Sequence, residues 1–419
     1  MIRVAVFSPF FPFPVTEGAY RVILEQVSCL QKSGAAVNLV VWKNQVEGVS
    51  RLLKLSDEID LAPDTPIVFL TARGSETWQM DQLRNLDKAS ATLAETRWER
   101  GFRVFSSLFR QESSSELFYY PPDLPYEAAL KNCDLALFHY TFGARVLERL
   151  AANHPKLSLG IYAHNIESDL YSDRVSGQKL GFVRLLDFIT YRKLLKLESS
   201  IGKQRIFLLV LNDMDREGFL KLGLPEDQVQ ILPPAYNSQL QERRKLRFAK
   251  TPRPERATWG FLGGLHFGPN RDSAIWILER LLPELRKRNF RGRIVIAGGG
   301  GEDLRRAHPN SEMLEWAGFV GQADSFFCSL TGFLAPHIRG SGVRIKILDS
   351  LSFGLPTATT TLGAQRLSTR AQTHDALFVS DDPGLWADHI CRGEGPSPSQ
   401  SHLDDEFVYK EWLTSRSTR

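Results

Sequence analysis

The residues best suited to chemistry in this sequence lie in one run of small and cationic side chains, His337–Lys346. The run contains Gly340, Ser341, Gly342, Arg344 and Lys346. A helix that begins at Gly-Ser-Gly would present unpaired N–H groups to a diphosphate, and the two cations would add positive charge without any metal. Apolar residues at helical spacing continue to Leu355, before Pro356. We therefore expect an anion site at the start of this helix.

Three further turns contain glycines where a backbone could approach a ligand closely. They are Pro14–Tyr20 with Gly18, Phe261–Asn270 with Gly263, Gly264 and Asn270, and the four glycines of Gly298–Gly301. Each follows a β-rich run, and a glycine at such a place leaves room for a phosphate or a nucleotide. Glycine also occurs in ordinary turns, so each of these signals is weak by itself.

The elements that must position these turns alternate along the chain. Short apolar runs that predict strands are separated by stretches with helical spacing, such as Gly18–Ser33. This alternation predicts parallel sheets with helices on both faces. The expected strands are Arg3–Phe7, Val37–Trp42, Ile67–Leu70, Leu135–His139, Leu159–His164, Phe207–Asn212, Gln230–Leu232, Thr258–Leu262, Arg293–Ala297, Gly332–Leu334 and Thr357–Thr360.

The alternation is interrupted once, which predicts two doubly wound α/β domains. We expect an N-terminal domain over 1–237, a linker over 238–257, a C-terminal domain over 258–395 and a tail helix within 396–419. The linker is polar and basic, and its run Arg243–Arg247 is expected to be a solvated face. Ligands of such domains bind at the carboxyl ends of the strands, so the expected site lies in a cleft between the two.

Composition excludes several classes of protein. The chain has 419 residues, with 42% apolar and 24% charged residues and a net charge of +4, so neither disorder nor a general nucleic-acid coat is expected. Four scattered cysteines predict no disulfide framework and no zinc site, which favours a cytoplasmic protein. No membrane span is apparent. Trp98–Gln111 could form a basic amphipathic helix. Packing on the sheet is the favoured interpretation, and a peripheral contact with the inner membrane surface stays open.

Five segments of the chain occur in the order of a known family pattern: His337–Leu367, Phe261–Leu278, Ala163–Ser168, Leu209–Phe219 and Ile231–Asn237. Together they resemble the family-4 glycosyltransferases, and in particular a polysaccharide-associated branch with Pro-Asn and His-Asn-x-Glu-Ser motifs. Residues 45–125 have no match. The resemblance implies the GT-B fold, in which two Rossmann-like domains face each other across a cleft, and a retaining transfer of sugar from a nucleotide donor to a hydroxyl.

The resemblance also implies roles for individual residues. The C-terminal domain would bind the nucleotide sugar, and the N-terminal domain would bind an acceptor: a surface polysaccharide, a lipid-linked sugar or a small natural product. The donor is expected to be a UDP-sugar, with no cofactor and no metal, and no nucleic acid is expected as a partner. The implied catalytic residues are His164, Arg344 and Lys346, and the implied donor-binding residues are Gly18, Gly263, Gly264, Asn270, Phe319, Val320, Gly340, Ser341, Gly342 and Asp349.

Two departures from the family pattern leave alternatives open. The family commonly has two glutamates eight positions apart, where this chain has Ser341 and Asp349. Asp349 could still bind the ribose hydroxyls, whereas Ser341 supplies no carboxylate. A catalytically weak GT-B protein that binds a nucleotide or a partner is therefore the alternative to an enzyme. A sugar-nucleotide epimerase is a third interpretation, which we rank below the others.

Overall fold

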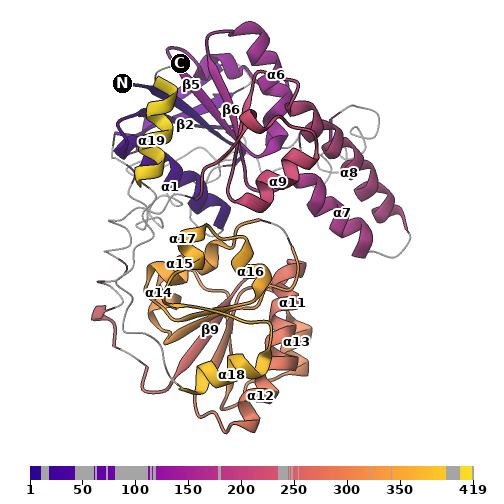
Figure 1. The fold of residues 1–419 in the computed structure, drawn as a ribbon, viewed down its shortest axis with the longest axis vertical. Coiled ribbons are helices and arrows are strands. Elements are labelled where there is room, and N and C mark those ends of the chain that lie inside the picture. Colours follow the sequence, from indigo (N-terminus) through magenta and orange to yellow (C-terminus); the bar gives the residue numbers. More distant parts are fainter. Residues whose placement is uncertain are drawn as a thin grey trace. The chain divides into compact units, whose positions relative to one another are not determined.

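The computed structural model describes residues 1–10, 18–42, 61, 64–71, 74–80, 112–113, 116, 119–177, 181–234, 244, 246, 249–252, 254–321, 323–340, 342–392 and 406–417. The chain divides into two compact units (Figure 1). Unit 1 comprises Met1–Asn237 together with Asp405–Arg419, and unit 2 comprises Ser238–Asp404. The amphipathic segment Trp98–Gln111 lies outside the described residues.

Unit 1 is built on an eight-stranded sheet in the order β4-β3-β2-β1-β5-β6-β7-β8. All pairs are parallel except β3 with β4, an antiparallel edge that the sequence analysis did not anticipate. The strands are β1 (Arg3–Ser8), β2 (Ala36–Trp42), β3 (Pro66–Thr71), β4 (Gly74–Gln79), β5 (Leu135–His139), β6 (Ser158–Ala163), β7 (Phe207–Val210) and β8 (Val229–Ile231). The helices of this unit include α1 (Gly18–Lys32), α6 (Ala144–Asn153), α7 (Glu167–Gly177), α8 (Phe182–Ile201), α9 (Asp213–Lys221) and α19 (Glu406–Ser417).

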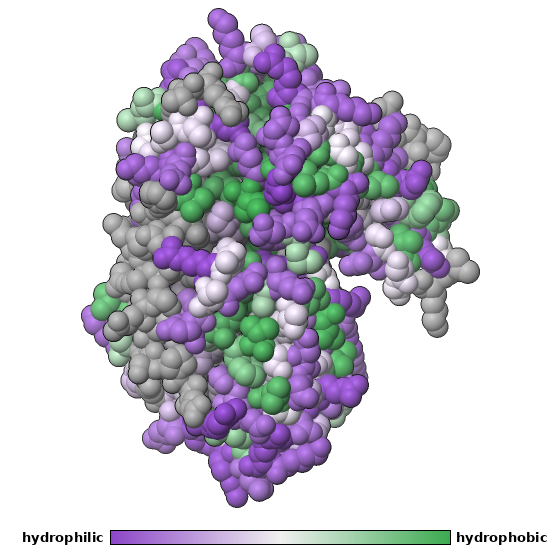
Figure 2. Space-filling view, viewed as in Figure 1, coloured by the Kyte–Doolittle hydropathy of each residue, from purple (hydrophilic) through white to green (hydrophobic). Residues whose placement is uncertain are grey.

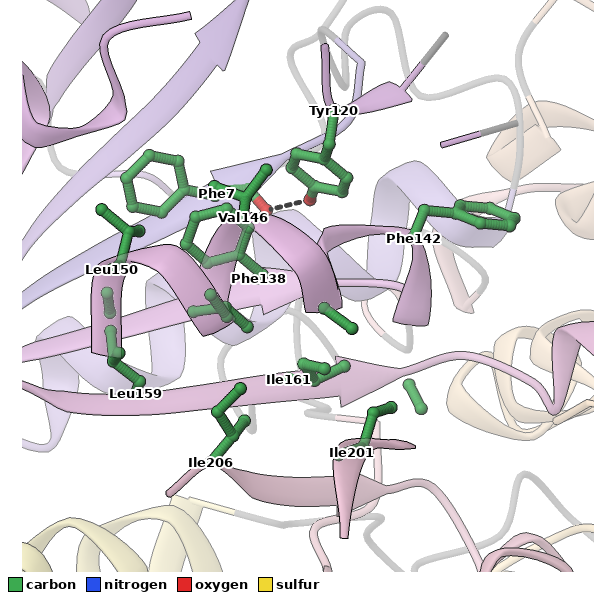
Figure 3. Close-up of a cluster of buried hydrophobic side chains, with 14 of the residues drawn as sticks. Phe7, Tyr120, Phe138, Phe142, Val146, Leu150, Leu159, Ile161, Ile201 and Ile206 are labelled. Atoms are coloured by element: carbon green, nitrogen blue, oxygen red, sulfur yellow. Dashed lines mark hydrogen bonds between the residues drawn. The ribbon is translucent and has the colours of Figure 1, made fainter. Parts of the chain in front are cut away.

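Aliphatic and aromatic side chains pack together in the core of unit 1 (Figure 3). Phe7 and Phe138, from the adjacent strands β1 and β5, stack with ring centroids 4.1 Å apart. The hydroxyl of Tyr120 lies 3.0 Å from the carbonyl oxygen of Phe7 and 2.8 Å from that of His139. Burial of one such ring contributes about 1.5–3 kcal/mol. The carboxyl ends of β1 and β5 are therefore held firmly together.

The C-terminal helix belongs to unit 1, where α19 packs beside α1 (Figure 1). Tyr409 is fully buried, and its hydroxyl donates to the carbonyl oxygen of Pro233 over 3.1 Å. The guanidinium of Arg416 lies 3.8 Å above the centre of the Phe207 ring. The chain thus returns from unit 2 to close the core of unit 1.

Unit 2 is built on a fully parallel six-stranded sheet in the order β11-β10-β9-β12-β13-β14. Its strands are β9 (Thr258–Leu262), β10 (Arg293–Ala297), β11 (Leu314–Gly318), β12 (Gly332–Ala335), β13 (Thr357–Thr359) and β14 (Leu377–Val379). The edge strand β11 mixes apolar and polar residues (LEWAG), and β14 is apolar but only three residues long (LFV). For this reason the sequence analysis missed both.

Helices cover this sheet, with α11 (Gly268–Trp276) and α15 (Ile345–Ser352) following the two central strands. The other helices are α12 (Leu282–Lys287), α13 (Glu302–Ala307), α14 (Ala323–Cys328), α16 (Thr361–Gln365), α17 (Thr369–Gln372) and α18 (Pro383–Arg392). Within the part of the chain that the structure describes, no helix is long and apolar enough to cross a bilayer.

The glycine run after β10 is required by close packing of the turns at the carboxyl edge of this sheet. Gly298 has φ +138°, and a Cβ there would lie 1.9 Å from the carbonyl oxygen of Gly263. Leu265 N–H donates to the carbonyl oxygen of Gly299 over 2.7 Å, and Gly298 N–H donates to that of Gly318 over 2.6 Å. The turns after β9, β10 and β11 therefore support one another through their backbones.

We predict that Gly298→Ala lowers the free energy of unfolding by about 3 kcal/mol, because the added carbon combines backbone strain with a backbone clash. Gly299→Ala is the matched control, since nothing lies within 4 Å of its added carbon. Urea unfolding of both variants measures the difference. Equal stability of the two would contradict this packing.

Candidate functional site

The predicted donor-binding turns of unit 2 meet where the order of the sheet reverses. The strands β9 and β12 are neighbours, yet their connections run to opposite sides. The turn after β9 carries Gly263, Gly264 and Asn270, and the segment after β12 leads to Arg344 and Lys346. In doubly wound sheets such a reversal leaves a crevice at the carboxyl ends of the strands, where ligands bind. The topology thus brings together two turns that are separated by about 70 residues.

Asn270 connects these two turns. Its Oδ1 accepts a hydrogen bond from the Nζ of Lys346 over 2.7 Å, and its Nδ2 donates to the carbonyl oxygen of Gly264 over 3.1 Å. A Cβ on Gly263 would lie 2.8 Å from the Cγ of Asn270, so that glycine leaves room for the amide. Three residues that the sequence predicted as separate donor contacts therefore form one connected structure.

Lys346 is a cation without a matching anion. Its Nζ meets the Asn270 amide oxygen and lies 5.0 Å from the centre of the Phe261 ring. Among the described residues no carboxylate pairs with it. Burial, and then the charge of Arg344, lower the pKa of Lys346 to about 7. An anion bound here would restore the charged form of the lysine.

Arg344 precedes helix α15, and this corrects the predicted helix start. We expected the helix to begin at Gly340–Gly342, but it begins at Ile345. Gly340 has φ +99° and Gly342 has φ +81°, values that a right-handed helix cannot include. These glycines form a turn instead, in which Nη2 of Arg344 donates to the carbonyl oxygen of Gly340 over 2.6 Å. Ser341 lies outside the described residues.

His337 adds an imidazole ring to the region of Arg344 and Lys346. The sequence analysis gave this histidine no chemical role. It is 3% exposed, and no hydrogen-bond partner for its Nε2 is found among the described residues. Burial holds the pKa of His337 well below its usual value, with further lowering by Arg344 and Lys346. The ring is therefore neutral at pH 7. The sequence analysis could not assign it a chemical role, because its burial near Arg344 and Lys346 is visible only in the structure.

The turn after β11 lies next to the glycine run that follows β10. Phe319 is 73% exposed and follows Gly318, whose carbonyl oxygen accepts from Gly298 N–H. Val320 is half-buried. An exposed phenylalanine beside the glycine run can stack on a base, so their predicted role stays open to test. Gly18, by contrast, is in unit 1, where it is the first residue of α1.

Arg244 differs from its sequence prediction, and Asp349 is one of its partners. We expected Arg243–Arg247 to be solvated, yet Arg244 is 2% exposed, and its guanidinium donates to Asp349 and Asp324 over 3.2 Å each. It also donates to the hydroxyl of Ser352 over 2.7 Å. A buried guanidinium needs such partners because an unpaired one is very costly. Asp349 thus anchors the segment before β9, and its role toward a ribose stays a prediction.

In unit 1, His164 follows β6 and lies beside His139, the last residue of β5. Nε2 of His164 and Nδ1 of His139 are 2.8 Å apart, and the His164 ring stacks on Tyr140 with centroids 4.2 Å apart. Burial lowers the pKa of His164 to about 3. This histidine is therefore neutral at pH 7 and acts through hydrogen bonds instead of through charge.

Two buried glutamates meet at the turn that follows this histidine: Glu167, close to it in sequence, and Glu198 from α8. Glu198 of α8 accepts hydrogen bonds from the backbone N–H of Glu167 (2.8 Å) and of Ser168 (3.2 Å), at the start of α7. It also accepts from the hydroxyl of Thr141 over 3.0 Å. Burial raises the pKa of Glu167 to about 8 and that of Glu198 to about 7. Glu198 thus holds the turn after β6 in place.

Comparisons with known proteins find a family match within unit 2. A family model described as glycosyl transferases group 1 matches residues 256–393. An uncharacterized 44.6 kDa protein from the cps region of Klebsiella pneumoniae is 26% identical over 138 residues, which cover 31% of this chain and 35% of the relative. The matched region therefore spans about a third of that curated relative.

Solved structures show the fold over the whole chain. A sucrose-phosphate synthase from Thermosynechococcus elongatus has a TM-score of 0.62 at 11% identity, covering 100% of this chain and 99% of that one. WaaG, a glycosyltransferase involved in lipopolysaccharide biosynthesis, has a TM-score of 0.55 at 14% identity and covers 100% and 96%. Anabaena HepE in complex with UDP-glucose has a TM-score of 0.54 at 12% identity, covering 100% of both. The chain thus has the GT-B fold of two α/β domains, and its residues 256–393 match the family model of the glycosyl transferases group 1.

Proposed function

We propose that this protein is a family-4 retaining glycosyltransferase that moves a sugar from a UDP-sugar to a hydroxyl acceptor. The observation that carries the proposal is the Lys346 ammonium, bound to Asn270 and without a carboxylate partner among the described residues. It lies at the strand ends of a glycosyl transferases group 1 domain. A diphosphate is the ligand whose charge suits this arrangement.

The chemistry follows from the charge that develops during transfer. When the bond from the sugar to the diphosphate breaks, negative charge accumulates on the departing phosphate oxygens. Lys346 and Arg344 stabilise that charge, and a site with fixed cations does so without reorganisation. The departing phosphate can then act as the base for the acceptor hydroxyl. In this proposal no metal and no second protein carboxylate is required.

The similar proteins support the classes of donor and acceptor. HepE is described as a complex with UDP-glucose, which favours a UDP-sugar here. WaaG is involved in lipopolysaccharide biosynthesis, and the Klebsiella relative is encoded in a cps region, which favours a surface glycan or a lipid-linked sugar as the acceptor. Phe319 and Val320 would contact the base, and His164 would contact the donor sugar.

The first test is nucleotide binding by thermal shift with UDP, GDP, ADP, dTDP and their sugar conjugates. UDP and one UDP-sugar are expected to raise the melting temperature most, because a ligand that binds the folded state stabilises it. Lys346→Met should abolish most of that shift, whereas Lys287→Met, which changes an exposed lysine in the same unit, should retain it.

The outcomes separate the candidate functions. Consumption of the sugar donor with transfer to an acceptor supports the enzyme. Binding of nucleotide without consumption of any sugar donor would support the binding protein instead. An absence of shift with every nucleotide would contradict the assignment of Lys346 and Arg344.

The lowered pKa of Lys346 makes UDP affinity depend on pH. The free site has a pKa of about 7, and a bound diphosphate must raise it, so above pH 7 binding takes up a proton. We predict that UDP affinity falls from pH 7.0 to 8.5 by up to about tenfold per pH unit. In this range the terminal phosphate, with a second pKa of about 6, is already ionised. Lys346→Arg should flatten the dependence because guanidinium stays charged.

Isothermal titration calorimetry at pH 7.0, 7.8 and 8.5 measures this dependence, and buffers of different ionisation enthalpy report the proton uptake. The same slope in wild type and Lys346→Arg would contradict a titrating lysine at the site.

We also propose that the peripheral membrane contact is made by helix α8. Phe182, Leu185 and Phe188 are 70%, 54% and 46% exposed. At helical spacing they share one face with Arg192 and Lys196, which are the exposed basic residues further along. The acidic residues of this helix, Asp187 and Glu198, fall on the other side. Apolar residues followed by cations on one face suit an anionic lipid surface.

Helix α8 is also accessible in unit 1. It packs antiparallel to α7, and the pair extends away from the sheet (Figure 1). Apolar and polar residues are interspersed on the surface of this pair (Figure 2). A groove along the helix is lined by Arg145 of α6 and by Arg192, Lys193 and Lys196.

We predict that the protein sediments with vesicles of phosphatidylglycerol and phosphatidylcholine more than with phosphatidylcholine alone. Replacing Phe182, Leu185 and Phe188 by serine should abolish binding, since each buried aromatic or leucine contributes about 1.5–3 kcal/mol. Leu385→Ser, at an exposed leucine of unit 2, is the control. Undiminished binding by the triple variant would place the contact elsewhere.

A further inference from the structure

Two histidines at the ends of neighbouring strands form a pair whose proton positions can be worked out. His139 ends β5 and is fully buried, and His164, 6% exposed, follows β6. The 2.8 Å contact joins Nδ1 of His139 to Nε2 of His164, so one of these atoms donates and the other accepts. The contact therefore leaves Nδ1 as the remaining ring nitrogen of His164.

Both rings are neutral at pH 7, so each carries one proton. Burial lowers the pKa of His139 well below its usual value, and that of His164 to about 3. Nε2 of His139 is buried and has no hydrogen-bond partner among the described residues. If His164 donated to His139, that Nε2 would carry an N–H with no acceptor. Orphaned buried N–H groups are rarer than under-satisfied buried acceptors, so the reverse arrangement is favoured.

We propose that His139 is a positioning residue that donates from its Nδ1 to Nε2 of His164 and so keeps the His164 proton on Nδ1. His164 then presents an N–H donor to its ligand. It binds a substrate oxygen and does not remove a proton from it, because its other nitrogen is already occupied. The tautomer is a property of unit 1 alone, whereas the identity of the ligand rests on the proposed function.

The surroundings keep both rings in position. The Tyr120 hydroxyl lies 2.8 Å from the backbone carbonyl oxygen of His139. It also lies 3.0 Å from that of Phe7 (Figure 3). Tyr140 stacks on His164 at an interplanar angle of 14°. His139 also lies against the Tyr162 ring, with centroids 5.3 Å apart. With its backbone and both neighbours fixed, the His139 ring keeps its nitrogen directed at His164.

The direct test is nitrogen NMR of the full-length protein labelled with ¹⁵N-histidine. Two-bond correlations distinguish protonated from unprotonated ring nitrogens, and the His164→Gln variant assigns the His164 signals. We expect the proton on Nδ1 of His164 in the wild type, and a mixture of tautomers in His139→Phe, which keeps a ring and removes the donor. A wild-type proton on Nε2 of His164 would overturn the proposal.

Kinetics test the consequence for turnover. His139→Phe should lower kcat about 10-fold, the scale of one oriented hydrogen bond, with the KM for the donor changed by less than twofold. His139→Asn places an amide N–H near the former Nδ1 and should recover part of that loss. Equal melting temperatures of the two variants serve as the control for folding.

The two proposals fail in different ways. Wild-type kcat in His139→Phe, together with an inactive His164→Gln, would overturn the positioning role. Full turnover by His164→Gln would instead remove His164 from the proposed transfer reaction, and the NMR result would still decide the tautomer.

Discussion

The partly buried ammonium of Lys346 is the interaction on which the organisation of unit 2 depends. A cation removed from water is costly unless it is paired, and here its hydrogen-bond acceptor is the amide oxygen of Asn270. Gly263 has no side chain because Asn270 fills that space, and Gly264 supplies the carbonyl that orients the amide. These features fit the proposed function, in which the diphosphate of the donor supplies the anion for Lys346.

Unit 1 provides a different chemical environment at its strand ends. Burial keeps His139 and His164 neutral, and it raises the pKa values of Glu167 and Glu198 to about 8 and 7. The histidines at this edge are therefore uncharged at pH 7, whereas unit 2 places the cationic side chains of Arg344 and Lys346 beside each other. This difference suits a reaction in which negative charge develops on a leaving diphosphate while the sugar is held by its hydroxyls.

Several residues have roles that differ from those read from their type and spacing. The glycines at 340 and 342 have positive φ values, so they form a turn that ends before α15 begins. Consequently Arg344 precedes the helix and Lys346 lies in its first turn. Arg344 is close enough that its charge lowers the pKa of Lys346. Arg244, in a segment with every appearance of a solvated linker, is buried between two aspartates because the fold brings Asp324 and Asp349 to it.

The sequence by itself determined the α/β class, the central strands and the glycine turns that follow them, because alternating apolar runs and glycine turns are local signals. It could not determine the edge strands β11, which mixes apolar and polar residues, and β14, which is only three residues long. Nor could it determine the pairing of His139 with His164, which are 25 residues apart. Tertiary structure also decided that Asn270 bridges Gly264 and Lys346 and that Asp349 binds Arg244. Burial and partner choice depend on strand order, and strand order brings together residues that no local pattern relates.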